Sequence, residues 1–317
     1  MPGPDAVLSQ SPAERRRVIV IGDVTTDIIT MLDQPVAVGS DTAVRIRISG
    51  GGQAANTAGW LAWHNHPVTL LASVGDDTFG HCRLAELRAL GVDCAFHWCP
   101  GVPTGMVIVL SNGSERSMLS ERGANMRLPV SHVDALITGL PDAAHVHLSG
   151  YVLLDDGSRP AGLRALAAAR DRGLTISVDA ASAQPLRAAG IGRCLSWLDG
   201  VDLLLANEDE AAVLTGGMPA EGAACALTAV ARNVVVKRGA AGAVWAGRNG
   251  VRLSSPARPA AAVDTTGAGD AFAAGLLSAL LEGCEQASAL DRAIDFGATA
   301  ATGIGGGPPG PPIGEVR

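Results

Sequence analysis

The hydrophobic positions of this chain fall into short continuous runs that are bounded by glycine or polar residues. Residues 18–22 (Val-Ile-Val-Ile-Gly) form the first of these runs. A continuous apolar run of this length is typical of a strand that is buried on both faces of a parallel sheet. The same reasoning predicts strands at residues 68–74, 144–148, 175–179, 202–206 and 234–237.

Segments with a helical pattern alternate with these strands. Helices are expected through residues 59–64, 78–90, 160–172, 208–214, 268–281 and 287–302. Strands that alternate with helices form a parallel sheet that is covered by helices on both faces. A short hairpin is expected over residues 242–253. The predicted fold class is therefore α/β, with a central, mostly parallel sheet.

Two segments interrupt this alternation. Residues 28–49 lack a helical period, and residues 44–48 within them alternate as a strand with one solvated face does. Residues 102–122 hold a second alternating pair of strands around Asn112-Gly113, a strong hairpin signal. We expect both segments to form one small β-sheet that projects from the main body.

Composition narrows the class of protein. A net charge of −7 and a pI near 5.5 argue against nucleic acid or an anionic membrane as the main partner. Residues 1–14 lack the apolar segment of a secretion signal and are expected to be a disordered leader. Residues 15–317 are expected to form a single α/β domain. The longest apolar helix, near residues 271–281, is too short to span a bilayer, so we expect a soluble, cytoplasmic protein.

Lys237 is the only lysine of the chain. A P-loop requires lysine in the motif GxxxxGK[ST], and the sequence around Lys237 does not match it, so this route to phosphate binding is excluded. Any phosphate must be held by backbone N–H groups, arginine and a metal ion.

Residues 264–270 (Asp-Thr-Thr-Gly-Ala-Gly-Asp) lead directly into the helix predicted at 268–281. Gly267 and Gly269 leave backbone N–H groups open to an anion, and the helix adds the positive end of its dipole. Asp270 lies in the first turn of this helix. A base beside an anion-binding turn is what transfer of a phosphoryl group to a hydroxyl requires. Asp270 as a plain helix cap is an equally open interpretation of the local pattern.

Three further segments carry candidate chemistry. Asp27 follows the first predicted strand, where ligands of open α/β sheets gather, although a solvated or capping aspartate explains it as well. The glycine run at residues 50–52 is a weak dinucleotide fingerprint, because the strand before it alternates. Asn207 and Glu210 stand three residues apart at a helix start and together also fit a capping box.

These motifs together resemble the ribokinase-like (PfkB) family of carbohydrate and nucleoside kinases. Residues 51–58 (Gly-Gly-Gln-Ala-Ala-Asn-Thr-Ala) and 264–272 are similar to the family's two signatures, and residues 207–210 (Asn-Glu-Asp-Glu) to its NxxE motif. The resemblance covers residues 18–307, with these elements in the family's order. It implies a ribokinase-like α/β fold with a small β-sheet lid formed by residues 28–49 and 102–122.

The resemblance also implies catalytic and metal-binding roles. Asp270 matches the catalytic base, and the N–H groups of Gly267, Ala268 and Gly269 match the anion hole. Asn207 and Glu210 match the residues that organise Mg²⁺, largely through water, in keeping with the ligand preferences of that ion. The implied substrates are ATP and a sugar.

Binding roles follow from the same resemblance. The aspartate that binds sugar hydroxyls corresponds to Asp27, and the loop that closes over the sugar corresponds to Gly51, Gly52, Gln53 and Asn56. The nucleotide-binding positions correspond to Asn207, Lys237, Gly239, Gly242 and Thr266. Asp264 corresponds to the ligand of a monovalent cation, which makes activation by K⁺ an expectation. The lid implies a homodimer.

The substrate stays open at this stage. Gln53 stands where ribokinase itself carries lysine, and Thr25 replaces an asparagine near Asp27, so ribose is not assured. A nucleoside kinase would need an apolar clamp, for which Met106, Met118 and Trp98 are the candidates in a chain with 3% aromatic residues. An acid sugar such as 2-keto-3-deoxygluconate would find carboxylate partners in Arg116 or Arg122.

Two alternatives come from other classes of protein. An NAD-dependent dehydrogenase would need GxGxxG directly after the first strand, and residues 22–27 do not supply it. A non-catalytic sugar-binding protein would have no use for a base at an anion site.

Overall fold

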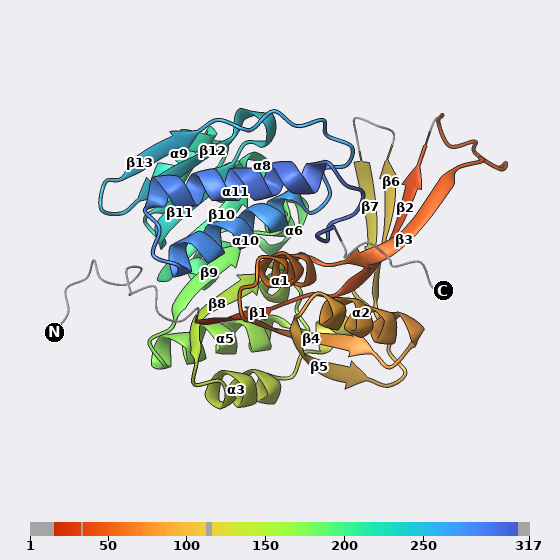
Figure 1. The fold of residues 1–317 in the computed structure, drawn as a ribbon, viewed down its shortest axis with the longest axis horizontal. Helices are drawn as coiled ribbons and strands as arrows, with labels where there is room; N and C mark the ends of the chain where they lie inside the picture. Colours follow the sequence, from red (N-terminus) through yellow and green to blue (C-terminus); the bar gives the residue numbers. More distant parts are fainter. Residues whose placement is uncertain (1–15, 33, 112–115, 310–317) are drawn as a thin grey trace.

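A nine-stranded sheet runs through the molecule in a computed structural model that describes residues 16–32, 34–111 and 116–309 (Figure 1). The expected leader at residues 1–14, the Asn112-Gly113 turn and the end of the C-terminal tail lie outside the described residues. The strand order is β13-β12-β11-β10-β9-β8-β1-β4-β5, and the pairs from β11 to β5 are parallel, whereas β12 and β13 are antiparallel. The predicted, mostly parallel sheet is confirmed.

The strands of this sheet are β1 (Arg17–Ile21), β4 (Val68–Gly75), β5 (Asp93–Cys99), β8 (Ala143–Ser149), β9 (Thr175–Asp179), β10 (Val201–Asn207), β11 (Ala231–Lys237), β12 (Ala243–Gly247) and β13 (Arg252–Ser255). The order reverses next to β1, because the chain proceeds from β1 to β4 on one side and later places β8 on the other. In open α/β sheets, ligands bind at the carboxyl ends of the strands beside such a reversal.

Helices cover both faces of the sheet. One face packs against α1 (Gln53–Trp63), α2 (Thr78–Ala89), α10 (Ala268–Leu281) and α11 (Gln286–Ala301), and these helices share a hydrophobic core with it. The second core lies on the other face, under α3 (Val130–Gly139), α4 (Tyr151–Leu154), α5 (Arg159–Asp171), α6 (Ala183–Ala189), α7 (Ile191–Leu198), α8 (Glu208–Thr215) and α9 (Ala220–Leu227). Two 3₁₀ turns, η1 (Gly123–Arg127) and η2 (Gly239–Ala241), complete the described elements.

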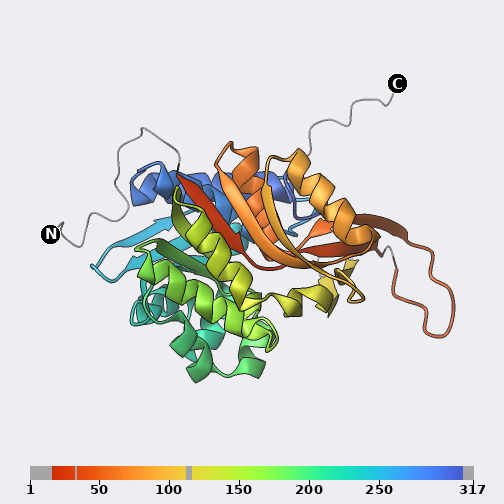
Figure 2. The same cartoon turned by 90° about the horizontal axis from the view of Figure 1, so that it is seen from below.

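A separate four-stranded sheet stands at one end of the molecule (Figures 1 and 2). Its order is β3-β2-β6-β7, formed by β2 (Thr25–Met31), β3 (Arg45–Gly51), β6 (Gly105–Ser111) and β7 (Arg116–Glu121). The outer pairs are antiparallel and the β2–β6 pair is parallel. The small sheet predicted from residues 28–49 and 102–122 is confirmed, and we call it the lid sheet.

The register of the lid sheet separates its two faces. Ser49, Asp27, Val107 and Ser120 lie side by side in one row across the four strands, and three of them line the large cavity described below. The neighbouring row consists of Ile48, Ile28, Ile108 and Leu119 and therefore points to the opposite, outer face. Residues 44–48 were expected to bury one face, but Ile46 and Ile48 are 62% and 57% exposed in this chain.

Candidate active site

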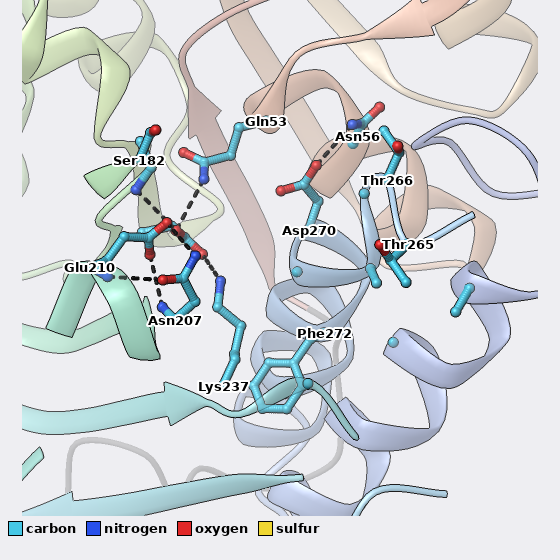
Figure 3. Close-up of a pocket in the computed structure, with 18 of the residues that line it drawn as sticks. Gln53, Asn56, Ser182, Asn207, Glu210, Lys237, Thr265, Thr266, Asp270 and Phe272 are labelled. Atoms are coloured by element: carbon cyan, nitrogen blue, oxygen red, sulfur yellow. Dashed lines mark hydrogen bonds and ion pairs between the residues drawn. The ribbon is translucent and has the colours of Figure 1, made fainter. Parts of the chain in front are cut away.

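A cavity of about 960 Å³ opens at the carboxyl ends of the central strands. It is bounded by the inner face of the lid sheet, the start of α1, the ends of β9, β10 and β11, and the start of α10. Figure 3 shows Gln53 and Asn56 at one end of the cavity, Phe272 at the other, and Asp270 between them. Candidate residues that are far apart in the sequence therefore share one open cavity.

The start of α10 forms the predicted anion-binding turn. Gly267 precedes the helix with a φ of 72°, which is a left-handed conformation. A Cβ on Gly267 would collide with the backbone of Gly306, so the C-terminal glycine loop packs directly against this turn. Because Gly267, Ala268 and Gly269 line the cavity, an anion bound there meets the N-terminal end of the α10 dipole.

Asp270 occupies the first turn of α10 and lines the cavity. Asn56 Nδ2 donates a hydrogen bond of 2.8 Å to its Oδ2 atom. Burial raises the pKa of Asp270 well above the ordinary value, and the hydrogen bond from Asn56 opposes that rise. Asp270 is not the N-cap residue of α10, because that position is held by Gly267 and the Asp270 carboxylate accepts a hydrogen bond from Asn56. A carboxylate with a raised pKa is a stronger proton acceptor than an ordinary aspartate.

Asp27 projects from β2 on the inner face of the lid sheet and is buried. Burial raises the pKa of Asp27 to about 6, although a 2.8 Å hydrogen bond from the Thr25 hydroxyl favours the ionised form. Gly51 is required beside it, since a Cβ at that position would collide with the Asp27 carboxylate. A buried carboxylate at the cavity wall is a strong acceptor for ligand hydroxyl groups.

The segment at residues 51–58 differs from its prediction. A loop was expected there, with the helix starting near Gly59, but α1 already begins at Gln53. Asp23 causes this early start, because its carboxylate accepts hydrogen bonds from the backbone N–H groups of Gln53 (3.1 Å) and Ala54 (3.4 Å). Gly52, which precedes the helix with a φ of 100°, makes the turn, and the Gln53 and Asn56 side chains are held by a helix.

Asn207 and Glu210 form the capping box that was the alternative interpretation of their spacing. The Asn207 side chain accepts from the Glu210 N–H at 2.9 Å, and Glu210 Oε2 accepts from the Asn207 N–H at 2.8 Å. Glu210 also lines the cavity, and burial together with the nearby Asp179 carboxylate raises its pKa. Capping α8 and facing the cavity are therefore compatible.

The remaining candidates surround the same cavity. Lys237 ends β11, and its Nζ donates a 2.6 Å hydrogen bond to Asp179. Gly239 and Gly242 form the following turn, and both adopt positive φ angles, of 52° and 86°. Thr266 donates to Asp264 Oδ1 through its N–H (2.9 Å) and its hydroxyl (2.7 Å).

Asp264 also reaches the C-terminal loop, where its Oδ2 accepts from the Gly305 N–H at 3.0 Å. This carboxylate therefore fastens the anion-binding turn to the glycine loop.

Several cavity residues were not found by sequence reasoning. Asp179 and Tyr151 lie at strand ends that carry no motif, and Asp23 follows the first strand without one. Arg122, which was considered only as a partner for acid sugars, bonds Asp155 at 2.7 Å and stacks over the Tyr151 ring at 4.5 Å. The position of Asp179 at the end of a predicted strand was the one available signal.

Comparison with known proteins identifies the family. Residues 15–312 match the pfkB family of carbohydrate kinases. The chain is 29% identical to a deoxyribokinase of Salmonella typhi over 298 residues, covering 91% of this chain and 93% of the relative. It is 32% identical to an ATP-dependent ribose-1-phosphate kinase of Halopiger xanaduensis over 291 residues, covering 90% and 92%.

A solved structure supports the same assignment. The putative ribokinase II of E. coli, in complex with ATP and Mg²⁺, superimposes with a TM-score of 0.82 at 26% identity over 92% of this chain and 94% of that one. The ribokinase-like fold expected from the sequence is thereby confirmed, and the dehydrogenase and the non-catalytic binding protein are set aside. The chain belongs to the pfkB family and is a carbohydrate kinase.

Proposed function

We propose that this enzyme transfers the terminal phosphoryl group of ATP to a primary hydroxyl of a neutral sugar. The observation that carries the proposal is the placement of Asp270. Its carboxylate lies in the same cavity as the glycine-containing turn at 267–269 and the buried carboxylate of Asp27. A base, an anion-binding turn and a hydroxyl-binding group are the three parts that this reaction needs from the protein.

The proposed chemistry divides among these residues. Asp27 binds hydroxyl groups of the acceptor, and Asp270 takes the proton from the reacting hydroxyl as its oxygen attacks the terminal phosphorus atom. The N–H groups of Gly267, Ala268 and Gly269 stabilise the negative charge on the transferring group, and ADP leaves. Gly239, Gly242 and Thr266 belong to the nucleotide-binding part of the cavity.

The residues around Glu210 fit a Mg²⁺ ion. Burial and the neighbouring Asp179 and Asp209 carboxylates disfavour the ionised form of Glu210, which a bound cation would favour. Among the described residues no group of three or more acidic, histidine or cysteine side chains is placed to bind a metal ion directly, so these residues suit Mg²⁺ that keeps several of its waters. Asn207 and Glu210 would hold the ion through water, and bound Mg²⁺ would neutralise charge on the ATP phosphates.

The acceptor part of the cavity favours a neutral sugar. Asp27, Gln53 and Asn56 offer hydrogen-bonding groups, whereas Arg122 is engaged by Asp155 and lies 3.6 Å from Asp23. An acid sugar would have to compete with these carboxylates for the guanidinium group. The side chain of Arg116 is not among those that the structure describes.

Of the three clamp candidates for a nucleoside, only Met118 is among the described residues that line the cavity, and Trp98 stacks on His81 instead. A nucleoside kinase therefore remains the second candidate, with Met118 as the observation in its favour.

Two further parts of the proposal concern the lid sheet and a cation. The outer face of the lid sheet exposes Ile46, Ile48 and Leu119, and an apolar face of this kind favours a homodimer formed through the lid. Closure of the lid over the acceptor would keep water away from the phosphoryl group. Activation by K⁺ is proposed at Asp264, because this carboxylate joins the anion-binding turn to the glycine loop.

The test is a measurement of ADP release with ATP and Mg²⁺ against a panel of pentoses, deoxypentoses, hexoses, keto-deoxy acids and nucleosides. We expect release that requires both Mg²⁺ and a neutral sugar. Release with a nucleoside but no sugar would favour the second candidate, and no release with any acceptor would refute the proposed reaction.

A further inference from the structure

Asp179 is a buried carboxylate of the cavity that receives hydrogen bonds from two candidate site residues. Its Oδ2 atom accepts from Lys237 Nζ at 2.6 Å, and its Oδ1 atom accepts from Gln53 Nε2 at 3.0 Å. The Asp179 side chain is 2% exposed. Figure 3 shows the side chains of Gln53 and Lys237 converging from opposite sides of the cavity. One carboxylate therefore connects the acceptor part of the site to the end of β11.

The ammonium group of Lys237 lies beside the anion-binding turn. A Cβ built on Gly269 would stand 3.2 Å from Lys237 Nζ, so no other side chain separates the two residues. The Lys237 side chain is 15% exposed and lines the cavity. A cation at this place adds to the backbone N–H groups that face the transferring phosphoryl group.

A lysine needs a partner to hold such a position. Its side chain has four rotatable carbon–carbon bonds and a compact charge, so an unrestrained ammonium group samples many positions. Asp179 supplies the restraint from the end of β9, two strands away from β11. Gln53 is fixed in the same way, since its Oε1 accepts from the Ser149 hydroxyl at 2.7 Å while its amide donates to Asp179.

We infer that Asp179 is a positioning residue for phosphoryl transfer: it holds the Lys237 ammonium group against the anion-binding turn and the Gln53 amide at the acceptor. The inference rests on the proposed function and adds to it a residue with no assigned role. The charged and titratable groups that face Lys237 are Asp179 on β9, Glu210 on α8, Asp270 on α10 and, more weakly, His147 on β8. Asp179 is the one of these that the Nζ atom contacts by a hydrogen bond.

A purely structural ion pair between β9 and β11 makes different predictions. Such a pair would affect stability alone, and its loss would lower the amount of folded enzyme without changing the turnover of the folded fraction. The experiment must therefore measure turnover per folded molecule and the position of the lysine itself.

The kinetic test compares Asp179→Asn, Lys237→Met and the double variant. We expect each single variant to lower kcat by about 10- to 100-fold with the KM for ATP changed less than about threefold, as for an interaction made mainly in the transition state. The double variant should be no slower than Lys237→Met, because Asp179→Asn keeps an oxygen that can accept from the Gln53 amide and its remaining effect acts through Lys237. It also removes both charges of the pair together, which keeps the test valid if Asp179→Asn alone folds poorly.

The matched control is Asp202→Asn. Asp202 lies on the neighbouring strand β10, bonds the Ile176 N–H at 2.9 Å and is not among the cavity residues. Its replacement should leave kcat unchanged. Unchanged turnover in Asp179→Asn, or a double variant whose loss equals the product of the two single losses, would overturn the inference.

A spectroscopic readout is independent of turnover. Because Lys237 is the only lysine, protein labelled with [ε-¹³C]lysine gives one lysine side-chain NMR signal when the expression tag contains no lysine. We expect a shifted, restrained signal in the protein without nucleotide, which moves again when ADP, Mg²⁺ and fluoroaluminate are added as a mimic of the transferring group. In Asp179→Asn this signal should return towards that of a free side chain, whereas Asp202→Asn should not change it.

A wild-type signal in Asp179→Asn would refute the positioning role even if the enzyme proved to be a sugar kinase. Conversely, the absence of ADP release across the acceptor panel would refute the proposed function and leave the measured position of Lys237 unaffected.

Discussion

The hydrogen bond between Asn56 and Asp270 provides a sharp test of the proposed base. Asn56 Nδ2 lies 2.8 Å from Asp270 Oδ2, and both groups face the cavity. This bond favours the ionised carboxylate against the burial that raises the pKa of Asp270. The change Asn56→Ala removes the donor and leaves the carboxylate in place, so the base should become harder to ionise.

The size of the effect follows from the kind of bond. A hydrogen bond to a charged group contributes about 1.5–3 kcal/mol. A difference of about 1.4 kcal/mol is tenfold in an equilibrium constant, so the pKa of Asp270 should rise further and the ionised fraction on the acid limb should fall by about 10- to 100-fold. Turnover needs the ionised base, and kcat therefore falls at acid pH and recovers once the pH exceeds the new pKa. Loss of the bond therefore moves the acid limb of the kcat–pH profile to higher pH.

The assay measures kcat for the accepted sugar from about pH 5 to about pH 10, so that it covers the titration of a carboxylate whose pKa is raised. Asn233→Ala is the matched control, because Asn233 is 7% exposed like Asn56 but bonds Trp245 and Asp202 away from the cavity. We expect the control to keep the wild-type profile. An unmoved limb in Asn56→Ala, with kcat lowered equally at every pH, would show that Asn56 does not act on the base.

Other changes test other parts of the site. In Asp27→Asn the acceptor KM should rise with little change for ATP. Burial raises the pKa of Asp27 from the ordinary 3.8 to about 6, so the folded wild type loses stability as pH rises through 6. Asp27→Asn lacks this titration, so its free energy of unfolding relative to the wild type should be higher at pH 8 than at pH 4, by up to about 3 kcal/mol. An equal difference between variant and wild type at both pH values would contradict this expectation. Gly269→Ala should lower kcat, because the added Cβ would lie 3.2 Å from Lys237 Nζ and would displace the ammonium group. Normal turnover would show that the turn does not need glycine at this position. Ile48→Lys places a charge on the exposed outer face of the lid sheet and should sediment as a monomer. A variant that still sediments as a dimer would show that this face is not the interface.

The sequence predicts the elements of the fold correctly where a run of residues is buried along its whole length. Runs such as residues 18–22 are buried on both faces of the sheet, so their composition alone indicates their place. The helix Ala268–Leu281 was predicted with its correct ends because a glycine turn precedes a long apolar segment. Strand β5 and helix α9 were missed, since β5 mixes half-buried polar and aromatic residues and α9 is alanine-rich with little periodic contrast.

The sequence predicts the site residues only where they form a local motif. Asp270 and the glycines before it form a local pattern, and the structure places them together with Asp27 in one cavity. Asp179 has no such pattern. Its contacts join residues 53, 179 and 237, and only the three-dimensional arrangement of the strands reveals them. The early start of α1 was hidden for the same reason, because Asp23 caps it from 30 residues away.

The central claim is that Asp270 accepts the proton of the reacting hydroxyl. The most direct measurement is kcat of Asp270→Asn with the accepted sugar, together with the dissociation constant of ATP. Removal of a general base costs about 10²- to 10⁴-fold, so kcat should fall by that factor while ATP affinity stays the same. Near-normal turnover in Asp270→Asn would contradict the mechanism proposed for this enzyme.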